Sequence, residues 1–164
     1  MNLEDFKVGV LFRWTNYNFQ HDNVVKDRYF IFLGKTNEFL TCNIDYHVIT
    51  GTSQIHYYQT GESRAKAHFL RFAVNEHSLP LETIFDVDLN LESHHITTFK
   101  NACSTQMSVV SQLSDEELRV LFEKIAESDR ISLQVKTDIR NAFDQSGIKN
   151  LPALRRRDAK YKFH

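Results

Sequence analysis

Arg28 is the first candidate for chemistry in the sequence, because it opens the apolar run YFIFL at residues 29–33. A guanidinium at the start of a buried strand can bind a phosphate through two parallel hydrogen bonds. It can also stabilise the charge that develops in a phosphoryl-transfer transition state. The plainer alternative is an ion pair between Arg28 and Asp27 or another surface acid.

The segment at residues 42–52, CNIDYHVITGT, is the second candidate. In an extended strand Asp45 and His47 lie on one face, and a carboxylate beside an imidazole orients its tautomer and raises its pKa. This pairing predicts general acid–base chemistry for His47. The hydroxyls of Thr50 and Thr52 can each donate to a phosphate oxygen. A purely structural role is the alternative for the whole segment.

The loop expected after the first strand is flanked by side chains that suit a single-stranded nucleic acid. Aromatic rings there can stack on unpaired bases and cations can contact phosphates, although packing in a core is the alternative for each ring. These candidates are Arg13, Trp14, Tyr17, Phe19 and Lys26.

The chain contains eight histidines, but they do not fall at a recognised zinc-ligand spacing. His94 and His95 point apart in an extended strand, which argues against a shared ion. We therefore expect no metal site and no cofactor. A zinc-dependent hydrolase is the alternative, and it predicts stoichiometric zinc in the purified protein.

The elements that must position these residues change character along the chain. The first half alternates apolar and polar residues or forms short apolar runs, which predicts strands. Phe85, Val87 and Leu89 form the inward face of the last of them. The expected strands cover residues 8–14, 28–34, 39–43, 55–59, 67–73 and 83–89, with 46–50 extending the third or forming its own.

The second half follows the helical period instead. Ser114 and Glu117 form a capping box ahead of apolar residues spaced three and four apart, so one helix begins there. A second helix is expected over residues 132–145, with Gly147 marking its end. Residues 93–112 are ambiguous and have room for a further short helix.

Strands followed by helices indicate an α+β chain. Short strands joined by short loops favour a small, strongly bent SH3-like β-barrel followed by two or three helices. We expect the barrel at residues 1–90, a helical extension packed on it at 91–150, and a basic tail at 151–164 with five cations and one acid. Such a tail can attract phosphate or acidic protein surfaces, or can serve only to keep the chain soluble.

The 164 residues carry a net charge of −1, with 41% apolar and 25% charged residues, which is typical of a globular protein. The two cysteines form no disulfide framework, and this fits a reducing compartment.

The sequence has no signal-peptide pattern and no apolar run that would span a bilayer, so we expect a cytoplasmic location. It also lacks GxxxxGK[ST], GxGxxG, GxSxG, HExxH and CxxC.

Residues 6–89 resemble the MazF/PemK-type toxin family, whose members have an SH3-like barrel and cut single-stranded RNA without a metal. Residues 6–12 (FKVGVLF) and 26–33 (KDRYFIFL) are similar to two early pieces of that family. Residues 49–52 (ITGT) are similar to its threonine-bearing segment, and 83–89 to its late strand. The helical second half is similar to the C-terminal extension of some relatives.

This resemblance implies a toxin-like endoribonuclease in which a ribose 2′-hydroxyl attacks the adjacent phosphate. Arg28 would stabilise charge, Thr50 or Thr52 would contact the phosphate, and His47 would be the acid–base residue. The implied partners are single-stranded RNA, an antitoxin protein and a second copy of the chain in a homodimer. The alternative is a non-enzymatic SH3-like binding module for nucleic acid or a partner protein.

Overall fold

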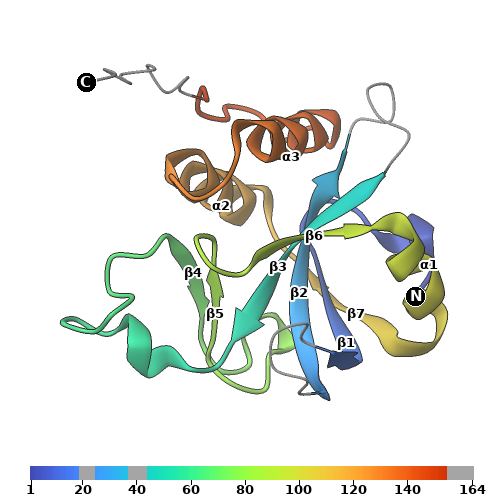
Figure 1. Cartoon of the computed structure of the whole chain (residues 1–164), viewed down its shortest axis with the longest axis horizontal. Helices are drawn as coiled ribbons and strands as arrows, with labels where there is room; N and C mark the ends of the chain where they lie inside the picture. The colour runs from blue at the N-terminus through green and yellow to red at the C-terminus, as the bar shows by residue number, and fades with distance from the viewer. Residues whose placement is uncertain (19–24, 37–43, 155–164) are drawn as a thin grey trace, which may run out of the picture.

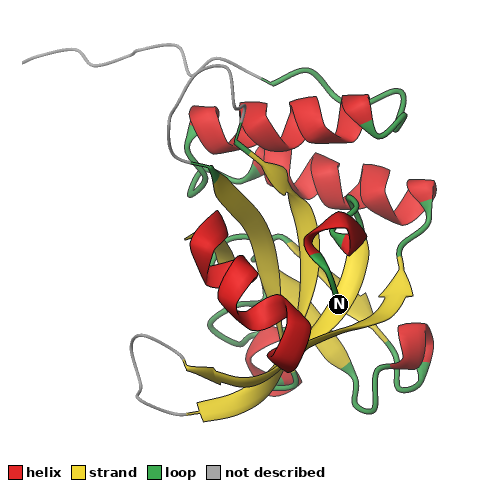
Figure 2. Ribbon diagram, turned by 90° about the vertical axis from the view of Figure 1, so that its right-hand side faces the viewer, coloured by secondary structure: helices red, strands yellow, loops and turns green. Residues whose placement is uncertain are grey.

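The computed structural model describes residues 1–18, 25–36 and 44–154. These residues form a seven-stranded antiparallel sheet with the order β4-β5-β3-β2-β1-β7, in which β6 also pairs with β3. The sheet curls into a half-barrel, with α2 and α3 together at one end and α1 apart from them (Figures 1 and 2). The elements are η1 (Leu3–Asp5), β1 (Val10–Asn18), β2 (Val25–Lys35), β3 (Asp45–Thr52), η2 (Ile55–Tyr58), β4 (Phe69–Phe72), η3 (Glu76–Ser78), β5 (Thr83–Asp86), β6 (Leu91–His95), α1 (Ile96–Gln106), β7 (Met107–Gln112), α2 (Asp115–Glu127) and α3 (Leu133–Gln145).

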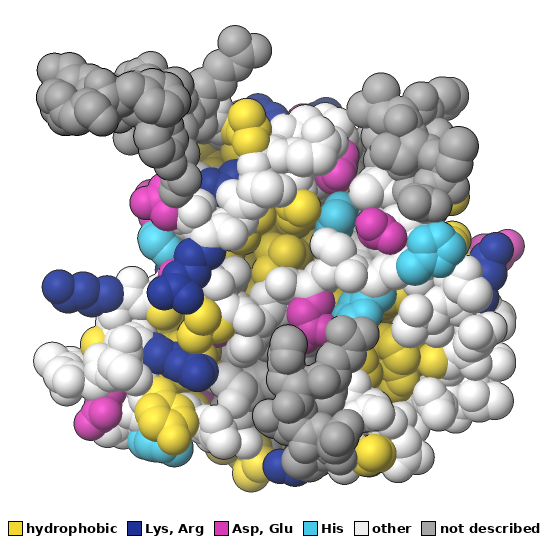
Figure 3. Space-filling view, viewed as in Figure 1, with side chains coloured by type: hydrophobic (Ala, Val, Ile, Leu, Met, Phe, Trp, Pro, Cys, Tyr) yellow, Lys and Arg dark blue, Asp and Glu magenta, His cyan; other side chains and the backbone are white. Residues whose placement is uncertain are grey.

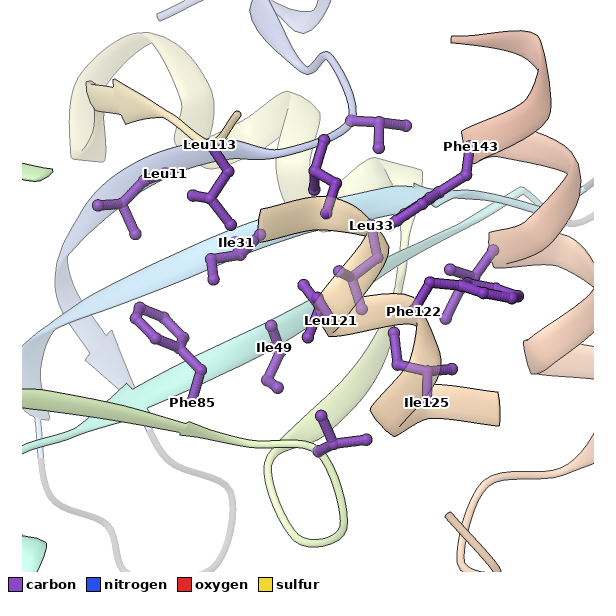
Figure 4. Close-up of a cluster of buried hydrophobic side chains, with 14 of the residues drawn as sticks. Leu11, Ile31, Leu33, Ile49, Phe85, Leu113, Leu121, Phe122, Ile125 and Phe143 are labelled. Atoms are coloured by element: carbon purple, nitrogen blue, oxygen red, sulfur yellow. The ribbon is translucent and has the colours of Figure 1, made fainter. Parts of the chain in front are cut away.

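The inner face of the curled sheet packs against α2 and α3. The apolar residues of α2 recur three and four positions apart, so Leu121, Phe122 and Ile125 form one stripe. Figure 4 shows this stripe directed at the strands beside Phe143 of α3. The strands contribute Leu11, Ile31, Leu33, Ile49 and Phe85 to this core.

The outer face of β1, β2 and β3 carries a second, aromatic core beneath α1. Phe99 of α1 contacts Phe6 edge-on, with 5.0 Å between the ring centroids. These strands are therefore buried on both faces, and this explains why residues 29–33 are continuously apolar rather than alternating. The strands contribute Phe12, Trp14, Phe30, Phe32, Tyr46 and Val48 to the aromatic core.

Both predicted helices are confirmed. The Ser114 hydroxyl accepts a hydrogen bond from the Glu117 backbone N–H at 3.3 Å, and the Glu117 carboxylate accepts one from the Ser114 backbone N–H at 2.7 Å. This capping box begins α2. Gly147, with a φ of +87°, follows the end of α3. The ambiguous segment at residues 93–112 contains the end of β6, then α1 and β7.

Two details of the predicted strands are wrong. Residues 55–59 form η2 instead of a strand, and their more buried residues, Ile55 and Tyr58, are three apart, as in a 3₁₀-helix. Leu89 is 43% exposed instead of facing inward. The chain turns there because the Asp86 carboxylate at the end of β5 accepts a hydrogen bond from the Leu89 backbone N–H at 3.1 Å.

The expected boundary at residue 90 falls inside the sheet, because β6 pairs with β3 and β7 pairs with β1. The helical extension and the strand-rich part are therefore interleaved. The strand expected at residues 39–43 and the basic tail beyond residue 154 lie outside the described residues. Within the part of the chain that is described, no helix is long and apolar enough to cross a membrane.

Candidate active site

A group of polar side chains lies at the edge of the aromatic core, centred on the carboxylate of Glu92 in β6. The Thr50 hydroxyl donates to Glu92 Oε1 at 2.9 Å, and the Tyr17 hydroxyl donates to Oε2 at 2.7 Å. His94 Nε2 lies 2.8 Å from the same Oε2 and 3.3 Å from the Tyr17 hydroxyl. We call these four residues the Glu92 cluster.

Strand pairing explains why three of these residues meet. β6 runs antiparallel to β3, with Glu92 opposite Val48 and His94 opposite Tyr46. Side chains on a strand alternate between its two faces, and directly paired residues share a face. Glu92 and His94 therefore lie on the same outer face as Thr50, two residues beyond Val48.

Tyr17 reaches the cluster through an irregularity in β1. The pairing of β1 with β2 shifts between Trp14 and Tyr17, where Asn16 has a φ of +55°. A bulge of this kind breaks the alternation of side chains. Tyr17 therefore joins Trp14 on the outer face, with 4.8 Å between their ring centroids. Arg28 lies opposite Trp14 on β2 and is half-buried.

Hydrogen bonding keeps the central carboxylate charged. Burial acts to raise the pKa of Glu92, but hydrogen bonds from His94, Tyr17 and Thr50 outweigh it and hold the pKa below its ordinary value. Burial and then Glu92 raise the pKa of the Tyr17 hydroxyl, and the nearby charge of Arg28 opposes this rise. At neutral pH the carboxylate is ionised and the phenol is a hydrogen-bond donor.

The ionised carboxylate decides which nitrogen of His94 donates to it. Because Glu92 can only accept, Nε2 carries a proton towards it, and Nδ1 is the nitrogen left for another partner. Nδ1 has no hydrogen-bond partner among the residues that the structure describes. The side chains of His94 and Glu92 are 13% and 24% exposed, so a ligand can reach them. Figure 3 shows histidine and acidic side chains gathered on the face around β6.

The structure separates His47 from this cluster. His47 is buried on the opposite face of β3, where Nδ1 is 2.8 Å from Ser93 Oγ and Nε2 is 3.7 Å from the Asp138 carboxylate of α3. Burial lowers the pKa of His47, against the opposing effects of Asp138 and Asp45. Asp45 acts to raise this pKa as expected, but the net shift is downward because desolvation is the larger effect.

The predicted base-stacking rings are packed inside the protein. Trp14 and Tyr17 are only 4% and 7% exposed, and both belong to the aromatic core. Their faces contact other rings, so neither offers a flat surface to a nucleic-acid base. Phe19, the third predicted ring, lies outside the described residues.

The remaining candidates are not part of the Glu92 cluster. Arg13 is exposed and pairs with Asp27, on the face of the sheet opposite to Arg28. Lys26 is exposed near the start of β2. Thr52 is half-buried at the end of β3, and its hydroxyl accepts a hydrogen bond from the Gln54 backbone N–H at 3.2 Å.

Sequence reasoning misses Glu92 and His94. Their spacing repeats the carboxylate–x–imidazole pattern of Asp45 and His47, so the same signal was available. The segment around them, LESHH, shows no apolar alternation and was not recognisable as a strand. Only its pairing with β3 brings Glu92 to Thr50, 42 positions earlier in the chain.

Comparisons with known protein families, with curated proteins and with solved structures found no match to this chain. The chemistry of the Glu92 cluster is therefore interpreted from its own geometry. The cluster contains a carboxylate–imidazole pair, and Arg28 lies on the same face of the sheet. A separate group of metal-ligating side chains, Glu76, His77 and Glu117, lies at η3 and the start of α2.

Proposed function

We propose that this protein is an endoribonuclease that cuts single-stranded RNA without a metal, with the Glu92 cluster and Arg28 as its active site. The observation that supports this most directly is the hydrogen bond between the Glu92 carboxylate and His94, on the same face of the sheet as Arg28. A base, a group that stabilises the protonated base and a cation for the phosphate are the parts that 2′-hydroxyl attack requires.

In this mechanism the Arg28 guanidinium binds the phosphate and stabilises the charge of the pentacoordinate transition state. His94 Nδ1 takes the proton of the ribose 2′-hydroxyl, and Glu92 stabilises the imidazolium that results. The 2′-oxygen forms a bond to phosphorus, and the bond from phosphorus to the 5′-oxygen breaks. The 5′-oxygen takes a proton from water, and the hydroxide that remains takes the 2′-proton from His94 and restores the base. The other product ends in a 2′,3′-cyclic phosphate.

Two roles differ from those expected from the sequence. His94 replaces His47 as the acid–base residue, because His47 is buried on the other face of β3. Thr50 becomes a positioning residue, since it is 2% exposed and its hydroxyl donates to Glu92. Thr52 keeps the proposed contact to phosphate. Its hydroxyl oxygen accepts a hydrogen bond from the Gln54 backbone N–H, so its own proton remains available to donate to a phosphate oxygen.

The curled antiparallel half-barrel is compatible with the SH3-like barrel of the MazF/PemK-type toxins, and we propose the same class for this chain. That proposal carries with it the antitoxin protein and the homodimer as partners. A non-enzymatic binding module is the competing function, because a polar cluster on a curled sheet can hold a ligand without reacting with it.

The test incubates the purified chain with a long single-stranded RNA in excess EDTA. The variants are Arg28→Ala and His94→Gln, with His56→Gln as the matched control because His56 is exposed on η2. We expect the wild type and the control to cleave. We expect each site variant to lose at least about a hundredfold in rate, the size of one catalytic group.

Two results would overturn the proposal. Cleavage by Arg28→Ala or His94→Gln at the wild-type rate would reject the site. Intact RNA with a folded wild-type chain would reject the nuclease, and RNA binding measured on the same samples would then identify the binding module.

A further inference from the structure

Three side chains of the types that bind metal ions lie close together where η3 meets the start of α2. One ligand atom from each of Glu76, His77 and Glu117 lies within 4.8 Å of the other two. His77 Nε2 is 2.7 Å from Glu117 Oε1. Among the described residues this is the one such group, and Glu117 comes from a segment 40 positions after His77.

The imidazole of His77 is held with Nε2 towards the two carboxylates. Its Nδ1 is 2.9 Å from the hydroxyl of Ser111 on β7, and its ring packs edge-on against Phe72 with 4.8 Å between centroids. A hydrogen bond on the second ring nitrogen usually orients a metal-ligating histidine. Ser111 holds the ring of His77 in this way without being a ligand itself, and an ion bound at Nε2 displaces the proton that Nε2 shares with Glu117.

Each carboxylate is also held in place through one of its oxygens. Glu117 Oε2 accepts hydrogen bonds from the backbone N–H and the hydroxyl of Ser114, both at 2.7 Å, which leaves Oε1 facing His77. Glu76 Oε2 accepts a hydrogen bond from the Ala73 backbone N–H at 2.7 Å.

The third ligand distinguishes this group from a simple ion pair. The contact between His77 and Glu117 does not use Glu76, although a carboxylate oxygen of Glu76 lies within 4.8 Å of the ligand atoms of both. A divalent cation at this point contacts all three side chains. One imidazole nitrogen with two carboxylate oxygens is a donor set for zinc, since magnesium and calcium prefer oxygen ligands alone.

We propose that Glu76, His77 and Glu117 bind one zinc ion, with water completing its coordination. The ion joins the turn between β4 and β5 to the first turn of α2, and Ser111 orients its histidine ligand. This site is separate from the Glu92 cluster and is independent of the proposed ribonuclease activity.

The test uses the untagged full chain after treatment with EDTA and dialysis, titrated with zinc chloride by calorimetry and followed by thermal unfolding. We expect one ion per chain at this site and a Tm increase of about 5–10 °C when free zinc is a hundredfold above Kd. His77→Gln and Glu76→Gln weaken binding at least about tenfold. His56→Gln is the matched control and leaves the affinity unchanged.

Ser111→Ala separates a metal site from an ordinary His77–Glu117 ion pair. Loss of the orienting hydroxyl weakens zinc binding about tenfold in a metal site. Absence of zinc binding to the wild type would leave only the ion pair and overturn the proposal, as would equal zinc affinity in wild type and His77→Gln. The RNA assay is run in EDTA, so the two proposals fail independently.

Discussion

Gly34 sets how closely α3 approaches the sheet. It lies in β2 with a φ of +134°, and a Cβ built there would be 2.3 Å from the Cβ of Ala142 on α3. Carbon atoms in contact normally lie about 3.5–4.0 Å apart. Gly34→Ala therefore forces both an unfavourable backbone conformation and a collision between strand and helix.

The two effects have separate magnitudes. A non-glycine residue in such a conformation costs about 1–3 kcal/mol, and overpacking of a well-packed interior costs about the same again. We expect Gly34→Ala to lower the free energy of unfolding by about 2–6 kcal/mol. Gly147→Ala is the matched control, because its φ is +87° but no atom lies within 4 Å of the added Cβ. It should cost only the backbone part, about 1–3 kcal/mol.

A double-mutant cycle isolates the collision. Ala142→Gly removes the methyl group that the new side chain at position 34 would strike, at a cost of about 1 kcal/mol for a glycine within a helix. Unfolding by guanidinium chloride measures the wild type, the two single variants and the double variant Gly34→Ala with Ala142→Gly. We expect a favourable coupling of about 1–3 kcal/mol between the two positions. Strictly additive effects would refute the close contact of β2 with α3.

Three further predictions concern the fold. Burial lowers the pKa of His47 from its ordinary 6.5, so the unfolded chain binds a proton at His47 more tightly than the folded chain does. The free energy of unfolding therefore decreases as the pH falls below 6.5. Urea unfolding at pH 7.5 and 5.5 should show this decrease in the wild type and a smaller decrease in His47→Asn. The same decrease in both proteins would contradict the prediction. Ser114→Ala removes the cap of α2 and should cost about 0.5–2 kcal/mol in the same assay, with no change contradicting the capping box. Phe122→Ala empties part of the inner core and should cost about 3–5 kcal/mol, whereas a cost below about 1 kcal/mol would place its ring outside that core.

The local sequence was enough to predict α2 and α3. The capping box of Ser114 and Glu117 and the spacing of Leu121, Phe122 and Ile125 depend on residues within two or three turns of each other. Residues 55–59 illustrate the opposite case. Their alternation favours a strand, but none of the described strands pairs with them, and the chain forms η2 instead.

The candidate site was predicted in part. Arg28 and Thr50 stand out in the sequence because a cation opens an apolar strand and a hydroxyl follows the next one. Glu92 and His94 do not, because the residues around them carry no alternation that reveals a strand. The sequence favours His47 over His94 as the acid–base residue, because it does not show which face of β3 points towards α3.

Short-range spacing along the chain is enough to show where strands give way to helices, which residues begin α2 and which side chains are able to do chemistry. Long-range pairing and packing are needed to show which of those side chains meet. Glu92 joins Thr50, and Glu117 joins His77, through pairing and packing between segments 42 and 40 residues apart. Desolvation also acts only once the chain is folded. It lowers the pKa of the buried His47, whereas the side chain of His94 stays 13% exposed.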